Sequence, residues 1–387
     1  MPDSFHSLIT TSLASRREQQ AYRSRRVVGG PQGPHISING KQYLSFCSND
    51  YLGLADHPDV VKAFQQAAND YGVGSGAAHL ISGHSRAHHA LEEELAAFVQ
   101  RPRALLFSTG YMANLGTVTS LIGKNDNVIE DRWNHASLID AGRSSGAQLR
   151  RYQHSDMDSL HQQLDGADHG NKLIVTDGVF SMDGDIAKLD ELTEIARQHN
   201  AWLMVDDAHG LGVLGEQGRG SLDTYKLTMD DVPVLMGTLG KAFGAFGAFV
   251  AGSDDLVEFL IQQARTYIYT TALPSAVAEA TRASLRLVQQ EQWRRDKLTT
   301  LVQRFRSGAQ QLGLTLTDST TPIQPLIIGG NEKALQLSQQ LYSNGILISA
   351  IRPPTVPENT ARLRITFCSA HEEQDVDTLL SQLETLA

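Results

Sequence analysis

A single charged side chain, Lys241, stands in the stretch MGTLGKAFGAFGAFVAG, which covers residues 236–252. Burying an unpaired ammonium group is costly. This lysine is therefore expected to be paired with an acid, exposed at the tip of a loop, or kept as a reactive amine. The other sequence motifs indicate which of these three roles Lys241 has.

Three motifs with acid–base or hydroxyl side chains follow successive apolar runs. TDGVFSMDGD contains Ser181, VDDAHG contains Asp206 and His209, and GTLGKAFG contains Thr238 and Lys241. The carboxyl ends of strands in an open α/β sheet are where ligands bind. A lysine there can form a Schiff base with pyridoxal 5′-phosphate (PLP), and a buried carboxylate can keep the pyridine nitrogen protonated. Singly, Asp206 could be a turn cap and His209 an ordinary loop histidine; together they favour a PLP site.

Two more stretches fit such a cofactor. STGYMANLGTV places Gly110 and Tyr111 where a strand gives way to a helix, and RWNHASLIDAG supplies His135. A helix N-terminus offers free N–H groups to a phosphate, and a flat imidazole can stack on a pyridine ring. Taken alone, His135 would more often be an ordinary surface residue.

Other stretches of the sequence resemble nucleotide-binding or metal-binding motifs but lack residues or structural context that those motifs require. GTLGKA lacks the first glycine of a Walker A loop, where Leu235 stands, and has Ala242 after the lysine. GLGVLG, residues 210–215, matches a dinucleotide fingerprint, but the EQGRGS that follows does not open a helix.

YGVGSGAAHLISG could be a loop where backbone approaches a ligand, or an ordinary connection. His84 and His88 are one helical turn apart without an obvious third ligand, so no metal site is expected.

Composition narrows the class of protein. The 387 residues are 41% hydrophobic and 20% charged with a net charge of −10, which argues against a general nucleic-acid binder. No apolar run approaches the roughly 20 residues of a membrane span, and no secretory signal pattern is seen. Two cysteines, Cys47 and Cys368, imply no disulfide framework, and a cytoplasmic setting is expected. The negative net charge has one local exception near the N-terminus, where several arginines form either a solvated helix face or an anion site. They are Arg16, Arg17, Arg23, Arg25 and Arg26.

Strands and helices alternate between residues 100 and 250. The expected buried strands are 103–108, 126–131, 172–178, 201–209, 232–238 and 247–252, with amphipathic helices at 88–99 and 189–200 among them. This order predicts an α/β domain with a mainly parallel central sheet flanked by helices. Beyond it come a long helical stretch at 274–313, strands at 323–330 and 361–368, and further helices. We expect an N-terminal segment 1–48, a large PLP-binding domain 49–280 and a small α/β domain 281–387.

Long motifs from about residue 20 to the C-terminus resemble the α-oxoamine synthases, which are fold-type I PLP enzymes. They are SNDYLGLADHP, GVFSMDGD, LMVDDAHG, GEQGRGS, GTLGKAFG and IRPPTVPENTARLRIT. The resemblance implies that Lys241 is the Schiff-base lysine, that Asp206 pairs with the pyridine nitrogen and that His209 contacts the ring hydroxyl. By the same resemblance, His135 stacks on the ring. The residues expected to line the cofactor and its phosphate are Ser181, Thr238, Gly110 and Tyr111.

The resemblance also implies substrates and a partner. Asn49 and Arg352 would hold an amino-acid carboxylate, a task that suits the planar guanidinium. Thr355 and Arg23 would contact an acyl substrate. The expected reaction is a decarboxylating condensation of L-alanine with a pimeloyl thioester, carried on coenzyme A (pimeloyl-CoA) or an acyl carrier protein. Family members act as homodimers with active sites at the interface, where Thr270 or Thr271 would reach the neighbouring subunit's phosphate.

Two alternatives remain at this point. A sibling synthase would use glycine or serine with another thioester, as glycine C-acetyltransferase does, although Ala208 in DDAHG and the segment IRPPTVP point away from it. A non-catalytic PLP-binding protein is the second, and retention of the lysine, aspartate and histidines argues against it.

Overall fold

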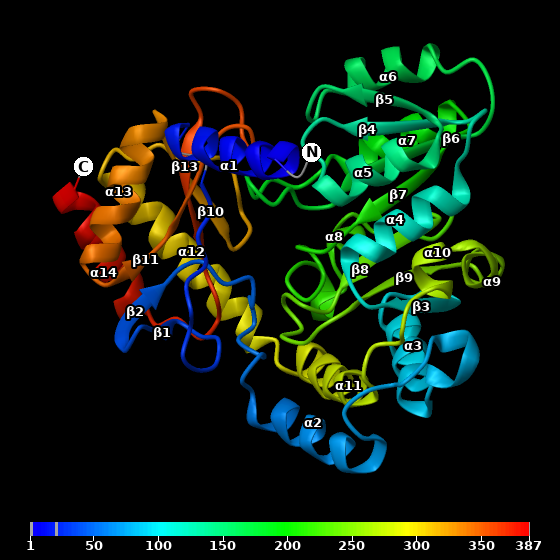
Figure 1. The fold of residues 1–387 in the computed structure, drawn as a ribbon, viewed down its shortest axis with the longest axis horizontal. Helices are drawn as coiled ribbons and strands as arrows, with labels where there is room; N and C mark the ends of the chain where they lie inside the picture. The colour runs from blue at the N-terminus through cyan, green and yellow to red at the C-terminus, as the bar shows by residue number, and fades with distance from the viewer. Residues whose placement is uncertain (1–2, 20–21, 387) are drawn as a thin grey trace.

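The computed structural model describes residues 3–19 and 22–386, and its largest element is a seven-stranded sheet (Figure 1). The strand order is β3-β9-β8-β7-β6-β4-β5. The bounds are β3 (Arg103–Phe107), β4 (Asn127–Asp131), β5 (Gln148–Tyr152), β6 (Lys172–Asp177), β7 (Trp202–Asp206), β8 (Val234–Thr238) and β9 (Ala248–Gly252). Strands β5, β4, β6, β7 and β8 run parallel, and β9 is antiparallel to both of its neighbours. The mainly parallel α/β sheet expected from the sequence is confirmed.

Both faces of this sheet are covered, because its central strands are apolar on both sides. Ile174 and Val205 belong to the core on one face, while Val175 and Met204 belong to the core on the other. The first core includes side chains of α3 (Arg86–Phe98), α6 (Met157–Asp165), α7 (Leu189–Gln198) and α11 (Ser275–Gln290). The second includes those of α4 (Gly110–Leu121), α5 (Ala136–Ser145), α9 (Asp254–Gln263) and α10 (Arg265–Ile268). Two covered faces explain why these strands are continuous apolar runs in the sequence.

Two three-stranded sheets make up the smaller part, on the left in Figure 1. One contains β10 (Ile323–Gly329), β13 (Ala361–Thr366) and β12 (Ser349–Ile351); the other contains β1 (His35–Ile38), β2 (Lys41–Ser45) and β11 (Ile346–Leu347). Around them lie α12 (Trp293–Gln311), α13 (Asn331–Ser343) and α14 (Glu373–Leu386). The expected boundary between residues 280 and 281 falls inside α11.

The remaining helices are α1 (Asp3–Glu18), α2 (Pro58–Tyr71) and the short α8 (Ser221–Thr224). A π-helical turn covers His79–Gly83, just before α3, and a 3-10 turn covers Glu216–Gly218. Among the described residues, no helix combines the length and the apolar character needed to cross a membrane.

The parallel strands bring the candidate site residues to one edge of the large sheet. Asp177 ends β6, Asp206 ends β7 and Thr238 ends β8. Asp177 and Asp206 are partners in the register of the two strands, and Met236 is the partner of Asp206 on the next. The carboxyl ends of three neighbouring strands therefore converge, as the sequence predicts.

Candidate active site

Lys241 lies on the tight connection between β8 and β9. The amide of Leu239 donates to the carbonyl of Gly247 at 2.9 Å, and the amide of Gly244 donates to the carbonyl of Lys241 at 2.8 Å. Gly244 has φ +62°, and a Cβ there would collide with the backbone of Leu54 and Ala55. Glycine therefore allows the lysine loop to turn sharply while packing against the segment after β2.

The amine of Lys241 faces a histidine. Its Nζ lies 2.9 Å from Nε2 of His209, whose Nδ1 lies 2.6 Å from the hydroxyl of Tyr51. Burial lowers the pKa of Lys241 to about 8, although the carboxylates of Asp206 and Asp177 act in the opposite direction. Burial, followed by the charge of Lys241, holds the pKa of His209 well below its ordinary value. Within residues 3–19 and 22–386, Lys241 forms no ion pair, so the arrangement favours a reactive amine.

Asp206 is buried and fixed by two donors. Nδ2 of Asn114 donates to Oδ2 at 2.7 Å, and the amide of Ala208 donates to Oδ1 at 3.0 Å. Asn114 stands on α4, so this helix orients a carboxylate on the neighbouring sheet. Burial, then the charge of Asp206, raises the pKa of Asp177 well above its ordinary value. The two acids at this edge therefore differ in environment, and Asp206 is the one that α4 positions.

His135 caps helix α5 at the same edge of the sheet. Its ring nitrogen Nδ1 lies 2.7 Å from Oγ of Ser137, and its amide donates to Oδ2 of Asp177 at 2.6 Å. Burial lowers the pKa of His135. Its side chain lines a cavity of about 680 Å³ that it shares with Ser181 and Thr355. Three residues predicted from separate motifs are thus brought to one cavity.

The first turn of α4 provides hydrogen-bond donors close to this edge. Thr109 caps the helix and accepts from the amide of Met112 at 3.2 Å. In the part of the chain that the structure describes, the amides of Gly110 and Tyr111 donate to no acceptor. The Thr238 hydroxyl donates to the carbonyl of Gly247 at 3.1 Å, which holds it at the end of β8. Such a helix N-terminus suits an anionic group.

Arg364 is a site residue that the sequence analysis did not select. It lies on β13 and is buried; its Nε donates to the carbonyl of Ser181 at 2.6 Å, and both terminal nitrogens reach Oδ1 of Asn49 at 3.2 Å. Its charge acts on both Lys241 and His209. Arg352, the predicted carboxylate ligand, lies after β12, and its carbonyl accepts from the amide of Thr355 at 3.0 Å.

Two predicted residues lie outside this cluster. Arg23 is exposed on the segment between α1 and β1, and among the described residues it forms no hydrogen bond or ion pair. Thr271 is exposed and pairs by an isolated β-bridge with Ala78, next to the π-helical turn. Tyr111 belongs to the cluster through its amide on the first turn of α4, while its hydroxyl donates to Asp140. These residues stay predictions.

Four residues of the cluster were not predicted: Tyr51, Asn114, Asp177 and Arg364. Asp177 ends an apolar run as Asp206 does, so its position at a strand end was an available signal. Asn114 follows Gly110 by four residues, which places both on one face of a helix. Arg364 and Tyr51 come from segments far from the large sheet in sequence, and only the fold brings them to it.

The residues at this edge fit PLP. A half-buried lysine can hold an aldehyde, and a positioned acid can hold a pyridine nitrogen. A histidine in the cavity can cover the ring, and a helix N-terminus with two amides that have no acceptor among the described residues can hold a phosphate. Oδ1 of Asn114 is buried and has no partner among the described residues, so the polar lining is incomplete without a bound group.

The chain is similar to known proteins over most of its length. A family model described as aminotransferase class I and II matches residues 41–383. The 8-amino-7-oxononanoate synthase of Thioalkalivibrio sulfidiphilus is 61% identical over 377 residues, which cover 97% of this chain and 96% of that protein.

Two solved structures are similar along nearly their whole length. A serine palmitoyltransferase variant from S. paucimobilis, with PLP and myriocin bound, has a TM-score of 0.92 at 29% identity and covers 99% of this chain and 97% of its own. The 8-amino-7-oxononanoate synthase of Francisella tularensis has a TM-score of 0.79 at 33% identity and covers 89% and 97%. Both likenesses extend over the large sheet and the smaller part alike.

Proposed function

The chain belongs to the class I and II aminotransferases and, among them, to the 8-amino-7-oxononanoate synthases, and we propose that it condenses L-alanine with a pimeloyl thioester. The products would be 8-amino-7-oxononanoate, CO₂ and the free thiol carrier, as a step of biotin biosynthesis. The observation that carries this proposal is the half-buried Lys241, whose amine lies 2.9 Å from Nε2 of His209, interacts with the charge of Asp206 and forms no ion pair within the part of the chain that the structure describes.

PLP is the cofactor, and when bound it withdraws electrons from the amino acid's Cα, which lets that carbon lose a proton and attack a thioester. Lys241 would hold the cofactor at Nζ. Once the amino acid's own amine has displaced it, the freed neutral amine of Lys241 would remove the Cα proton as a general base. A pKa near 8 favours that role, because a lysine at its ordinary value of about 10.4 would almost always be protonated at neutral pH.

The other residues would position and orient the cofactor. Asp206, held by Asn114 and the amide of Ala208, would keep a proton on the pyridine nitrogen. His135 would cover the ring from the cavity, and the amides of Gly110 and Tyr111 would take the phosphate. Ser181 and Thr238 would complete the cofactor lining.

Arg364 is the arginine that we assign to the alanine carboxylate, in place of Arg352. Its guanidinium already contacts Oδ1 of Asn49 and lies close enough to Lys241 for its charge to act there. An arginine can hold a carboxylate through two parallel hydrogen bonds. Thr355 would contact the acyl chain from the cavity that His135 also lines. Arg23 would join it from the N-terminal segment.

We also propose a cytoplasmic homodimer with active sites at the interface. Several large apolar side chains are exposed in the segments around the π-helical turn and Thr271, which agrees with a covered surface. Val73 is 88% exposed, Ile81 81% and Tyr269 72%. Thr271 would then reach the partner's phosphate. Light scattering of the purified enzyme would measure the mass, and a monomer at micromolar concentration would contradict the dimer.

The test of the proposed reaction pairs two lysine variants. The purified enzyme should show the visible absorbance of lysine-bound PLP, and should release CO₂ with L-alanine and pimeloyl-CoA or pimeloyl-acyl carrier protein. Lys241→Ala should lose both signals. Lys188→Ala is the matched control, because Lys188 is a surface residue paired with Glu191. Turnover of glycine or serine with another thioester, but not of alanine, would keep the family and overturn the substrate.

A further inference from the structure

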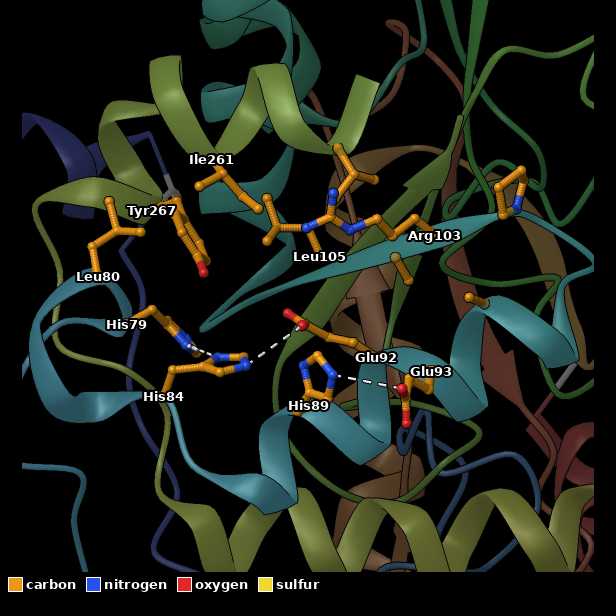
Figure 2. A pocket seen from close by; sticks show the side chains of 14 residues that line it. His79, Leu80, His84, His89, Glu92, Glu93, Arg103, Leu105, Ile261 and Tyr267 are labelled. Carbon is orange, nitrogen blue, oxygen red and sulfur yellow. Dashed lines mark hydrogen bonds and ion pairs between the residues drawn. The ribbon is translucent and has the colours of Figure 1, made fainter. Parts of the chain in front are cut away.

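Four histidines and a glutamate gather outside the proposed active site, in segments that the reaction does not use. All of them except His88 line a cavity of about 410 Å³ between the π-helical turn, the first turns of α3 and strand β3 (Figure 2). The group consists of His79, His84, His88, His89 and Glu92. Only the spacing of His84 and His88 was apparent in the sequence, and the fold brings the other three side chains close to them.

Hydrogen bonds show which atoms of this group are already engaged. Nδ1 of His84 lies 3.0 Å from Nδ1 of His79, and Oε1 of Glu92 accepts from the amide of Leu106 at 2.9 Å. The remaining atoms, Nε2 of His84 and Oε2 of Glu92, face one another at 3.9 Å, as the dashed line in Figure 2 shows. Each of these two side chains is therefore held at one atom while the other atom points to its neighbour.

His88 is committed elsewhere. Its Nδ1 accepts from the amide of Ser85 at 3.0 Å as part of the cap of α3, and its Nε2 lies 2.6 Å from the carbonyl of Leu273. Using either nitrogen for another purpose would cost a buried hydrogen bond. His89 is different, because its side chain is 66% exposed and its only polar contact among the described residues is Glu93 at 3.5 Å.

We propose that His84, His89 and Glu92 bind a divalent transition metal ion, with Zn²⁺ as the probe. One ligand atom from each lies within 4.8 Å of the other two. Ligands of a tetrahedral zinc ion at bonds of about 2.0–2.1 Å are about 3.3 Å apart. His89 can close that gap by a change of rotamer, because its ring is in solvent. His89 and Glu92 are three residues apart on α3 and so share one face.

The ligand set and its surroundings both suit zinc. Two imidazoles and a carboxylate leave a fourth position for water, as in open zinc sites. The bonds from His79 and from the Leu106 amide would orient two ligands, which is the usual task of outer partners at metal sites. Bound metal would tie the segment that begins at His79 to α3. Ala272 donates its amide to the carbonyl of Ala77 at 3.0 Å, so the Thr271 segment is coupled to it.

Isothermal titration of the EDTA-treated, PLP-loaded enzyme with Zn²⁺ tests this site. The native enzyme should bind one equivalent, and His89→Ala and Glu92→Gln should each weaken binding by at least about tenfold. His169→Ala is the matched control, because this exposed histidine belongs neither to the proposed ligand group nor to the lining of the cavity. This variant should bind Zn²⁺ as the native enzyme does.

Co²⁺ provides a second readout that does not depend on activity. It should give visible absorption bands typical of four-coordinate cobalt, and these should disappear in His89→Ala. Absence of Zn²⁺ binding, or full affinity in both His89→Ala and Glu92→Gln, would overturn the site. Loss of binding in His79→Ala with full affinity in His89→Ala would also overturn it, and would move the metal to the other three histidines.

Discussion

At the residue scale, Lys241 has a desolvated amine that forms no ion pair with any residue that the structure describes. With a pKa of about 8, roughly one amine in ten is neutral at pH 7, compared with fewer than about one in a thousand at the ordinary value. Only the neutral amine attacks an aldehyde, so the rate at which PLP-free enzyme recombines with PLP should rise with pH and level off above about 8. Stopped-flow absorbance between pH 6 and 9.5 measures this, with Lys188→Ala as control. A rate that still rises in proportion to hydroxide at pH 9.5 would contradict the lowered pKa.

Arg364 and Arg352 can be distinguished by matched substitutions. Arg364→Lys keeps the charge but loses the planar pair of donors, and hydrogen bonds to charged groups contribute about 1.5–3 kcal/mol. The KM for L-alanine should therefore rise by about 10- to 100-fold, with little change in the affinity for PLP. Arg352→Lys should change that KM by less than about threefold. Steady-state kinetics would decide, and the reverse order of the two effects would restore Arg352 as the carboxylate ligand.

The sequence could predict those site residues that end strands of one sheet. Asp206, His209 and Lys241 follow apolar runs directly, so local pattern and the geometry of parallel sheets were enough to bring them together. Arg364 could not be selected in this way, because it lies within β13 among apolar residues and its neighbours Asn49 and Ser181 come from other parts of the chain. Which arginine faces the lysine depends on how the smaller part packs against the large sheet.

At the scale of elements, His154 joins three loops at the edge of the cavity. Nδ1 lies 3.1 Å from Oδ1 of Asp131 at the end of β4, and Nε2 lies 3.0 Å from Oδ2 of Asp185 in the segment after β6. Trp133 stacks on its ring at 3.9 Å. Burial alone would lower the pKa of His154, but the two carboxylates outweigh it and raise the pKa to about 9. The protonated histidine therefore supports the wall that carries Ser181.

A pH dependence of stability follows from this histidine. Its folded pKa lies above the unfolded value of about 6.5, so its contribution is fully present below pH 6.5 and is lost as the pH rises through about 9. A pKa shift of this size corresponds to a contribution on the order of 3 kcal/mol to the free energy of unfolding. His154→Gln should lower the urea midpoint strongly at pH 6 and weakly at pH 9.5. His169→Gln is the control, and an equal loss at both pH values would exclude the ionised form.

Strands differed in how clearly the sequence marked them. β6, β7 and β8 are covered on both faces and are continuous apolar runs, which made them predictable. β5 was missed because it is an edge strand with Arg150 and Arg151 in its centre, both of which donate to backbone carbonyls. The π-helical turn before α3 has no local sequence signal, and the histidines that it brings to α3 were therefore missed as a group.

At the scale of the whole molecule, the loop after β6 joins the large sheet to the smaller part. Ser319 and Thr321 both donate to the carbonyl of Gly184, at 2.9 and 3.0 Å, and Arg362 pairs with Asp183. Gly184 has φ +74°, and a Cβ there would collide with Ser319 and the carbonyl of Ile323. The contact between the two parts therefore depends on a residue without a side chain.

Gly184→Ala should lower the stability of the enzyme and raise its KM for alanine, because Ser181 and Arg364 would shift together. The left-handed backbone alone costs about 1–2 kcal/mol for a residue with a Cβ, and the collision adds to it. Gly146→Ala is a close control, since Gly146 has φ +76° and open space around its Cβ position. Urea unfolding and alanine kinetics of both variants measure the difference. Equal effects of the two substitutions would show that the packing of Gly184 is unimportant.

The order of these residues along the chain has a consequence for synthesis of the protein. All the large-sheet groups that we assign to PLP, from Gly110 to Lys241, precede β13, and β9 closes the lysine loop by residue 252. At roughly 5–20 residues per second, the ribosome needs about 6–25 s more to reach Arg364. A nascent chain thus contains every large-sheet residue that we assign to the cofactor before its substrate clamp exists. Cofactor captured at that stage would favour the growing chain's large sheet over its unfolded form.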